Sequence, residues 1–282
     1  CSISLGIDVS SFTCANLGAN TVTLTGTDPS GNSRTATVTV TVQDTISPTA
    51  VAQDLTVYLD GSGNASITTG DVDNGSADNC SLASLSLNVS SFTCANVGAN
   101  SVTLTATDTD GASSTATATI TVLDTITPTL TAQDITVYLD GTGNASITSA
   151  DVDNGSSDNC SFALSIDVSS FTCANIGANT VTLTGTDPSG NSRGATATVT
   201  VRDTLSPTAV AQDLTVYLDG TGNVNITTGD VDNGSSDNCS LASLGLDVSS
   251  FTCAYVGANT VSLTATDAEG NTGTATATIT VR

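Results

Sequence analysis

Apolar and polar residues alternate over much of this chain, most clearly at residues 101–108. Val102, Leu104 and Ala106 fall on one side of an extended segment there, and threonines occupy the other side. Residues 115–122 repeat the pattern, with Ala, Ile and Val opposite Thr. Alternation with a period of two predicts β-strands with one buried face. No stretch has the period of a helix, so we expect an all-β chain.

The segments around these strands have the composition of shorter strands, turns and loops. Residues 50–59 and 64–68 predict two short strands, and DGSGN at 60–64 has the Gly/Asn chemistry of a hairpin turn. Residues 69–80 show no apolar period and predict a loop, after which 85–89 alternates as another strand. Short alternating strands with regular turns indicate an antiparallel β-sandwich.

The chain repeats itself with a period of 79 or 80 residues. Residues 44–122 and 203–281 differ at only fifteen of 79 aligned positions. A fixed period of this length predicts an array of small, separately folded domains. We expect the C-terminal half of a repeat at 1–43 and complete repeats at 44–123, 124–202 and 203–282, arranged in series. The chain has the pattern of a window cut from a longer polymer.

Eight cysteines, two per repeat, are candidates to stabilise cores that are poor in aromatic residues. The expected disulfide residues are Cys1, Cys14, Cys80, Cys94, Cys160, Cys173, Cys239 and Cys253. The short spacing within each repeat favours four local bonds: Cys1–Cys14, Cys80–Cys94, Cys160–Cys173 and Cys239–Cys253. The competing arrangement links Cys94 to Cys160, if these residues lie at facing ends of neighbouring repeats. Disulfides imply an oxidising compartment.

The chain carries a formal net charge of −23, from 26 Asp, one Glu and four Arg. We do not expect it to bind nucleic acid or anionic lipid, because both require clustered Lys and Arg. Neither a signal peptide nor a membrane-inserting segment is recognisable. The choice of Asp over Glu favours turns, Asx hydrogen bonds and oxygen-rich cation sites.

Each complete repeat contains an acidic loop, DVDNGSxDN, with three carboxylates in eight residues. Such carboxylates repel one another unless a cation or a set of amide donors compensates. Calcium takes six to eight oxygen ligands and fits this composition, so we predict structural Ca²⁺. The alternative is that these aspartates only cap turns through Asx hydrogen bonds.

Strand direction predicts where the acidic residues meet. If five main strands alternate in direction, the acidic loop and the turn at Asp108 share the N-terminal end of a repeat with linker residue Asp44. The turn at Asp60 then lies at the C-terminal end, beside linker residue Asp124 and the next acidic loop. The candidate metal ligands are Asp44, Asp60, Asp71, Asp73, Asp78, Asp108, Asp124, Asp140, Asp151, Asp153, Asp158, Asp187, Asp203, Asp230, Asp232 and Asp237.

The order of these motifs resembles a known module. DN(C), then F-x-x-x-x-V-G-A-N-x-V-x-L-T-A-T-D-x-x-G-N, then a Thr/Val strand, resembles the HYR-type immunoglobulin-like module. The cysteine-bearing version, DNGSxDNC…FTCANVGANTVTLT, is similar to tandem repeats of giant cell-surface adhesins of Bacteroidetes, including gliding-motility adhesins. The resemblance covers the whole chain. It implies a secreted, extracellular, rod-like protein at the bacterial cell surface.

The linkers carry a second motif in the light of this resemblance. Asp-Thr-aliphatic triplets fit the Asp-Ser/Thr-aliphatic pattern that Bacteroidetes use for O-glycosylation. The candidate O-glycosylation sites are Thr45, Thr125 and Thr204. Repeat duplication explains their regular placement equally well.

Catalysis has little support in this composition, because the chain has no histidine and no lysine to act as base or nucleophile. We expect no enzyme activity. The preferred function is a stalk or filament segment of an adhesin that spaces or multivalently presents adhesive contacts. Expected partners are adjacent repeats or further copies of the chain, with surface polysaccharides as another class. The alternatives are an array of glycan-binding modules and a self-assembling filament subunit completed by strands from a neighbouring chain.

Overall fold

The computed structural model describes residues 2–282 and divides into two compact units, the first ending at Ile126 and the second spanning Thr127–Arg282. We describe each unit by itself. Both are all-β, as the alternation predicted, and the complete repeats are tandem immunoglobulin-like β-sandwiches. The α-helices among residues 2–282 are single turns of four residues, and no helix there could cross a membrane.

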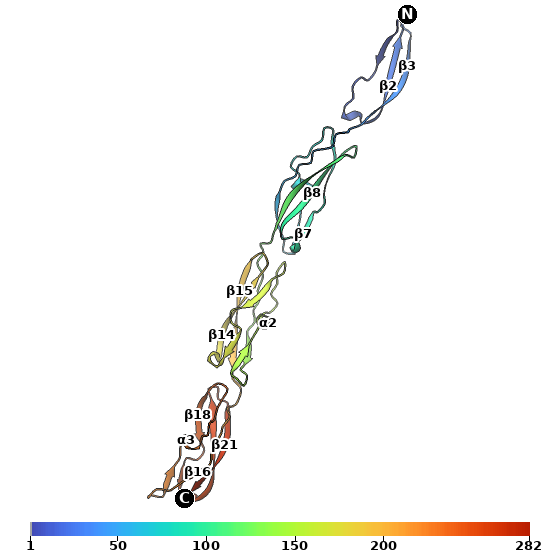
Figure 1. Ribbon diagram of the computed structural model, residues 1–282. Coiled ribbons are helices and arrows are strands. Elements are labelled where there is room, and N and C mark those ends of the chain that lie inside the picture. The colour runs from blue at the N-terminus through green and yellow to red at the C-terminus, as the bar shows by residue number, and fades with distance from the viewer. Residues whose placement is uncertain (1) are drawn as a thin grey trace. The chain divides into compact units, whose positions relative to one another are not determined.

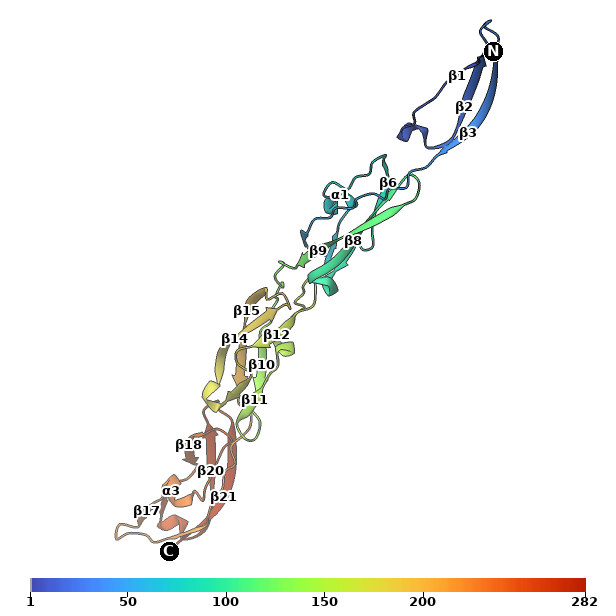
Figure 2. The ribbon, with the colours of Figure 1, turned by 45° about the horizontal axis from the view of Figure 1, so that its top comes forward.

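In the first unit, the complete repeat has one four-stranded and one two-stranded sheet. The large sheet has the order β4 (Leu55–Tyr58), β9 (Ser113–Leu123), β8 (Gly98–Asp108) and β6 (Leu82–Leu87). The small sheet pairs β5 (Asn64–Ser66) with β7 (Ser91–Thr93). The helical turns are α1 (Thr69–Val72) and the 3₁₀ turn η2 (Cys94–Asn96). Figure 2 shows β6, β8 and β9 lying side by side.

The second unit contains the same arrangement twice. Its first large sheet has the order β10 (Ile135–Tyr138), β15 (Ser192–Arg202), β14 (Gly177–Thr186) and β12 (Ala163–Ile166), with β11 (Asn144–Ser146) and β13 (Ser170–Thr172) in the small sheet. The second has β16 (Leu214–Val216), β21 (Thr272–Val281), β20 (Gly257–Asp267) and β18 (Leu241–Leu246), with β17 (Asn223–Asn225) and β19 (Ser250–Thr252). The helical turns are α2 (Ser149–Val152), η3 (Cys173–Asn175), α3 (Thr228–Val231) and η4 (Cys253–Tyr255), and α2 and α3 are labelled in Figure 1.

The long β8–β9 hairpin confirms the strongest prediction from the alternation. Val102, Leu104 and Ala106 of β8 are fully buried. In β9, Ala118 is buried opposite Val102, and Ile120 is buried two residues further along the strand. The threonines between them point away from the core. Every second residue of each strand therefore contributes to one apolar face.

The predicted hairpin around residues 60–64 is wrong. β4 pairs in parallel with β9, whereas β5 pairs with β7 in the other sheet. The turn is present, with Gly63 at a φ of 74°, but it carries the chain from one sheet to the other. A Gly/Asn turn reports a sharp reversal of the chain, and it does not report which neighbours the flanking strands find.

The acidic loop contains a helical turn that the sequence pattern did not reveal. α1, α2 and α3 each place one valine, Val72, Val152 or Val231, in the core with no exposed surface. A single turn of four residues is too short to show a 3.6-residue period.

In the second unit, one apolar cluster in each repeat joins the two sheets. In the repeat 124–202, Phe171 of β13 packs with Val181 and Leu183 of β14, Val199 of β15 and Val152 of α2. The corresponding rings Phe92 and Phe251 are also about 1% exposed.

Residues 2–43 form one sheet in the order β1 (Ser4–Ile7), β2 (Gly18–Thr27), β3 (Ser33–Val42), with the 3₁₀ turn η1 (Cys14–Asn16). Ile3 and Leu5 are 66% and 68% exposed there, whereas Leu104 in the complete repeat is fully buried. The second sheet and helical turn that cover this face in a complete repeat have no counterpart within 2–43.

Candidate metal centre

Three carboxylates converge at the N-terminal end of the last repeat, inside the second unit. One oxygen each of Asp203, Asp237 and Asp267 lies within 4.8 Å of the other two. Asp203 belongs to the linker before β16, Asp237 to the loop after α3, and Asp267 to the end of β20. The pairing of β18 with β20 places Leu241 opposite Asp267 and so brings the acidic loop to this strand end.

Two oxygens of this cluster are buried without a hydrogen-bond partner. Asp203 is 4% exposed; its Oδ1 accepts from the Leu205 N–H at 3.1 Å, and its Oδ2 has no partner. Asp237 accepts from the Cys239 N–H through Oδ2 at 3.0 Å, and its buried Oδ1 has none. A buried charge without a partner costs several kcal/mol. A cation beside two such oxygens and a third carboxylate would offset this cost.

Asn271 holds the third carboxylate in place. Its backbone N–H and its Nδ2 each donate to Asp267, at 2.7 Å in both cases. The same Nδ2 donates to the Asp203 carbonyl oxygen at 3.2 Å, which ties the linker to the turn after β20. The side-chain oxygen of Asn238, next to Asp237, is also buried without a partner.

The donor set fits a hard divalent cation. All the available atoms are oxygens, and calcium–oxygen distances imply that two oxygens on one ion lie at most about 5 Å apart. A cavity of about 200 Å³ borders the cluster, with Asp203, Asp267 and Glu269 in its wall. A water molecule takes about 30 Å³, so a cation with several waters fits there.

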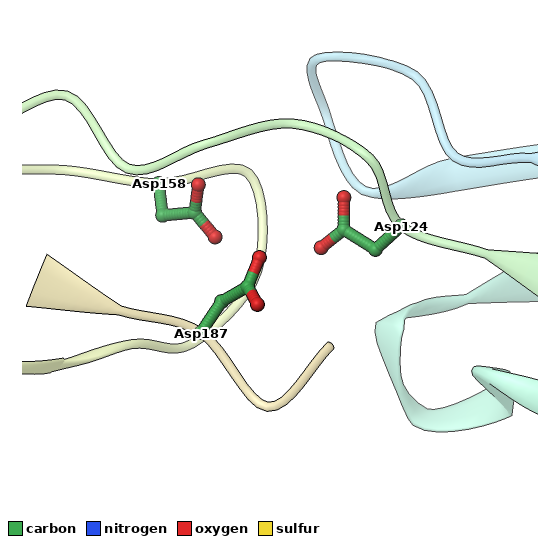
Figure 3. A group of neighbouring side chains, drawn as sticks. All are labelled: Asp124, Asp158 and Asp187. Atoms are coloured by element: carbon green, nitrogen blue, oxygen red, sulfur yellow. The ribbon is translucent and has the colours of Figure 1, made fainter. Parts of the chain in front are cut away.

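The preceding repeat repeats part of this arrangement. Figure 3 shows the carboxylates of Asp158 and Asp187, the counterparts of Asp237 and Asp267, pointing toward each other. Asp158 accepts from the Cys160 N–H at 3.2 Å through Oδ2, and its buried Oδ1 has no partner. Asp124 is the sequence counterpart of Asp203 in the first unit; it is 6% exposed and accepts from the Ile126 N–H at 3.1 Å.

The repeat in the first unit differs at the linker. Asp44 is half-buried, and its Oδ2 accepts from the Asn79 Nδ2 at 3.0 Å. Its own N–H donates to Asp110 at 2.7 Å. Asp78 and Asp108 each keep one buried oxygen without a partner. The counterparts of Asp108 differ, because a side-chain amide, Asn191 or Asn271, donates to their second oxygen and Ala112 stands at that position here. In this repeat, the side-chain amide of Asn79 is therefore the hydrogen-bond partner of the linker carboxylate.

The first two aspartates of every acidic loop cap local structure and do not join the cluster. Asp71 accepts from the Thr68 N–H and hydroxyl, both at 2.7 Å, and Asp73 accepts from the Ser76 N–H at 3.0 Å. Asp151, Asp153, Asp230 and Asp232 make the equivalent contacts. Asx capping, the alternative from the sequence, describes these six residues, whereas the third aspartate of the last loop, Asp237, joins the buried cluster with Asp203 and Asp267.

Asp60 and Asp140 cap the turn that follows β4 and β10. The Asp140 Oδ1 accepts from the Thr142 N–H at 2.8 Å, the Thr142 hydroxyl at 2.7 Å and the Asn144 N–H at 3.0 Å. Asp60 accepts from the N–H groups of Ser62 and Asn64. Within the second unit, the Asp140 carboxylate is not brought to the Asp203 cluster, although its backbone carbonyl accepts from the Asn238 Nδ2 at 3.2 Å.

These caps predict an acid limit to stability. The Thr68 hydroxyl and N–H lower the pKa of Asp71, and the corresponding threonines lower the pKa of Asp151 and Asp230 below the ordinary 3.8. A lowered folded-state pKa stabilises the fold above the unfolded-state pKa, and the contribution is lost as pH falls through the folded value. At pH values under about 4, the melting temperature measured in chelator should therefore decrease as the pH is lowered. The triple variant D71N/D151N/D230N should lose part of this acid slope, and an unchanged slope would contradict the assignment.

The structure thus places the predicted site residues in two classes. Asp203 and Asp237 come together at one buried site, and Asp158 and Asp187 come together in the preceding repeat. Sequence reasoning missed Asp267, although the periodicity contained the signal, because Asp267 occupies the position of Asp108 and Asp187 in its repeat.

The predicted local disulfides are wrong. Cys14 is bonded to Cys80 and Cys173 to Cys239, each across 66 residues and between neighbouring repeats. These bonds exclude Cys1–Cys14, Cys80–Cys94, Cys160–Cys173 and Cys239–Cys253. Cys94 and Cys160 are also disulfide-bonded, and Cys1 lies outside the described residues. The alternative pairing of Cys94 with Cys160 has the same 66-residue spacing and stays a prediction for a non-reduced peptide map.

The length of one strand explains why the local bonds do not form. In the repeat 124–202, Cys173 precedes the start of β14, and Cys160 precedes β12, which pairs with the far end of β14. Ten residues of strand span roughly 30 Å. Bonded cysteines have Cα atoms about 4.4–6.8 Å apart. Cys173 instead meets Cys239 with a Cα–Cα distance of 5.4 Å.

Cys253 is the exception among the predicted disulfide residues. It is exposed and is the free cysteine of residues 2–282. Its surroundings match those of Cys173, because both sulfurs lie 3.7 Å from the carbonyl oxygen of a turn glycine, Gly222 or Gly143.

Gly143 gives a sharp test of the junction inside the second unit. It has a φ of +75°, and an added Cβ would lie 2.6 Å from the Cys173 Sγ and 2.8 Å from the Asn238 carbonyl oxygen. G143A should lower the free energy of unfolding by at least about 1–2 kcal/mol, the cost of the left-handed backbone alone. G141A is the control, since a Cβ there meets nothing within 4 Å. Equal melting temperatures for the two variants would contradict this packing.

The three candidate glycosylation threonines, Thr45, Thr125 and Thr204, are exposed.

No protein-family model matches the chain, and no curated protein matches it. Among solved structures, the chain is similar to protocadherin gamma B7 extracellular cadherin domains 1–4, with 12% identity, 99% of this chain and 92% of that chain covered, and a TM-score of 0.33. It is also similar to Drosophila N-cadherin EC1–4, with 10% identity, 99% and 90% covered, and a TM-score of 0.33. Titin domains I67–I69 give 11% identity, 84% and 99% covered, and a TM-score of 0.36. Similarity at this level carries no inference about function.

Proposed function

We propose that this chain is a segment of an extracellular, adhesion-type stalk in which cations and disulfides hold neighbouring repeats together. Its work is mechanical: it spaces an adhesive region from the cell or presents many weak contacts at once. The repeat architecture, the disulfides between repeats and the large negative charge support this proposal.

The observation that carries the cation part is the pair of buried carboxylate oxygens without partners, Asp203 Oδ2 and Asp237 Oδ1. Their site lies at the N-terminal end of the last repeat, and Cys239 of this repeat is bonded to the preceding one. Asp203, Asp237 and Asp267 would hold a calcium ion, with waters completing its oxygen shell. The ion would neutralise three carboxylates contributed by a linker, a loop and a strand end, and so fix these elements against one another.

Calorimetric titration of the full chain with calcium chloride tests the cation part. We expect binding, and we expect the variant D203N/D237N/D267N to bind fewer ions per chain. A calcium concentration of 100 times Kd should stabilise a site by about 2.7 kcal/mol over chelator. D213N is the matched control, because the Asp213 carboxylate contacts the Thr278 N–H on the surface. Absence of binding, or equal stoichiometry in both variants, would refute the cation part.

The finer assignment is a bacterial surface adhesin of the Bacteroidetes repeat type, with gliding-motility adhesins as the model. The motif order described above supports it, and so does the exposure of Thr45, Thr125 and Thr204 as O-glycan acceptors. Protease treatment of intact host cells should release peptides of this chain, with glycan mass on those three linker threonines. Peptides released only after lysis, or found at unmodified mass, would count against the localisation or the modification respectively.

A second candidate function is multivalent contact with surface polysaccharides. One tyrosine recurs at the same place in each complete repeat, at or just after the edge strand of the large sheet, and Tyr58, Tyr138 and Tyr217 are 60%, 60% and 67% exposed. Exposed rings of this kind can stack on sugar faces. Y58A/Y138A/Y217A should lose retention on immobilised host polysaccharide with an unchanged melting temperature, and full retention would exclude this role.

A further inference from the structure

Three consecutive residues, Asp237, Asn238 and Cys239, connect the Asp203 site to the Cys173–Cys239 disulfide. Asp237 supplies a buried, unpartnered oxygen and accepts from the Cys239 N–H at 3.0 Å. Cys239 carries the bond to the preceding repeat. Asn238 lies between them, with its carbonyl oxygen 3.7 Å from the Cys173 Sγ and its Nδ2 donating to the Asp140 carbonyl at 3.2 Å.

One cavity also joins the two features. Cys173, Ile176, Cys239 and Ser240 form one part of its wall, and Asp203, Asp267 and Glu269 form another. The volume of about 200 Å³ next to the carboxylates is thus bounded by the disulfide itself. Both features lie inside the second unit, between its two repeats.

We propose that the Cys173–Cys239 bond positions Asp237 for cation binding, so that the disulfide and the cation stabilise each other; this rests on the proposed cation site. Without a cation, three carboxylates within 4.8 Å repel one another and favour movement of the acidic loop away from Asp203 and Asp267. The covalent bond holds residue 239 to the preceding repeat and, through the Cys239 N–H, holds Asp237. The ligand is then already in place when the ion arrives.

Loss of the bond should weaken calcium binding at this site about tenfold, the lower end of the effect of groups that orient metal ligands. Linkage makes the effect reciprocal: calcium must make the bond harder to reduce by the same factor. A dithiol reductant donates two electrons and two protons to the two sulfurs. The Sγ–Sγ bond breaks, two protein thiols form, and the reductant closes to its cyclic disulfide.

The test uses the full chain and two readouts. Calorimetric calcium titrations compare the wild type, C173S/C239S and C253S; the last removes a free cysteine in the same local setting. In the unmodified chain, dithiothreitol equilibria with calcium or with chelator are quenched by alkylation, and peptide masses report the Cys173–Cys239 bond alone. The second readout requires no cysteine variant to fold.

We expect C253S to bind like the wild type, C173S/C239S to lose about tenfold in affinity at one site, and calcium to raise the dithiol concentration needed to reduce the bond about tenfold. D203N/D267N should abolish the calcium effect on reduction. If the wild type binds calcium but neither the double cysteine variant nor the reduction equilibrium responds, the linkage is refuted and the cation site stands. If the wild type binds none, both fall.

Discussion

Replacing Phe171 by alanine should lower the free energy of unfolding of its repeat by about 3–5 kcal/mol. Phe171 belongs to β13; its ring is 1% exposed and packs against the central strands of the large sheet and α2. Large side chains are scarce in this core, where the neighbours are valine, leucine, isoleucine and alanine. Those β-branched and small residues on a hydrogen-bonded sheet cannot collapse into the space that the ring leaves.

A repeat of about 80 residues loses roughly 4–8 °C in melting temperature per kcal/mol. F171A should therefore give an early, separate transition in calorimetry. Y138A is the control in the same repeat, because Tyr138 is 60% exposed and its removal should change stability by no more than about 0.5 kcal/mol. Similar shifts for the two variants would show that the ring does not organise the core.

Strands with one apolar and one polar face could be predicted from the sequence. β8 and β9 were predictable because valine, leucine and alanine alternate with threonine along both strands, and one face of each is buried. The partners of β4 and β5 were not. Their turn residues determine a chain reversal, whereas the parallel pairing of β4 with β9 depends on residues more than 60 positions away.

The acidic loop shows a similar limit. Composition indicated a cation or a set of caps and could not say which aspartates of a loop are caps and which one joins a buried carboxylate cluster. Asp71 and Asp73 lie within three residues of Thr68 and Ser76, so local donors satisfy them. Asp78 accepts from the N–H groups of Cys80 and Ser81 through one oxygen only, and its other oxygen is buried without a partner. The fold brings its counterpart Asp237 to a buried site beside residues from 34 and 30 positions away. Local sequence predicts the caps, and only tertiary structure selects the ligand.

The predicted pairing of the cysteines was wrong for a geometric reason. Thirteen or fourteen residues suggested a short loop, but in the repeat 124–202 that segment contains the strands β12 and β13, and its two cysteines lie near opposite ends of β14. The regular 66-residue spacing between repeats was visible in the sequence. Choosing it required knowledge of which ends of the repeats carry each cysteine.

Removing the Cys173–Cys239 bond as C173S/C239S should lower the summed free energy of unfolding of the two repeats in the second unit by about 4 kcal/mol. The closed loop spans 66 residues, and the chain-entropy model gives about 3 kcal/mol for 15 residues and 4.7 for 100. The loop contains β14 and β15 of one repeat and β16, β17 and α3 of the next. Unfolding of either repeat therefore releases a chain that the bond still restrains.

Calorimetry in chelator should show this loss as a lower melting temperature and as poorer overlap of the two transitions, since the chelator removes any cation contribution. C253S should leave both unchanged, because Cys253 has the same 3₁₀ turn and glycine contact as Cys173 but no bond. If C253S destabilised the chain as much as C173S/C239S does, the effect would come from the local contacts of the cysteine in its 3₁₀ turn and not from the bond. The loss of stability can be assigned to the bond between repeats only if C173S/C239S lowers the melting temperature and C253S does not, since Cys173 and Cys253 make the same glycine contact.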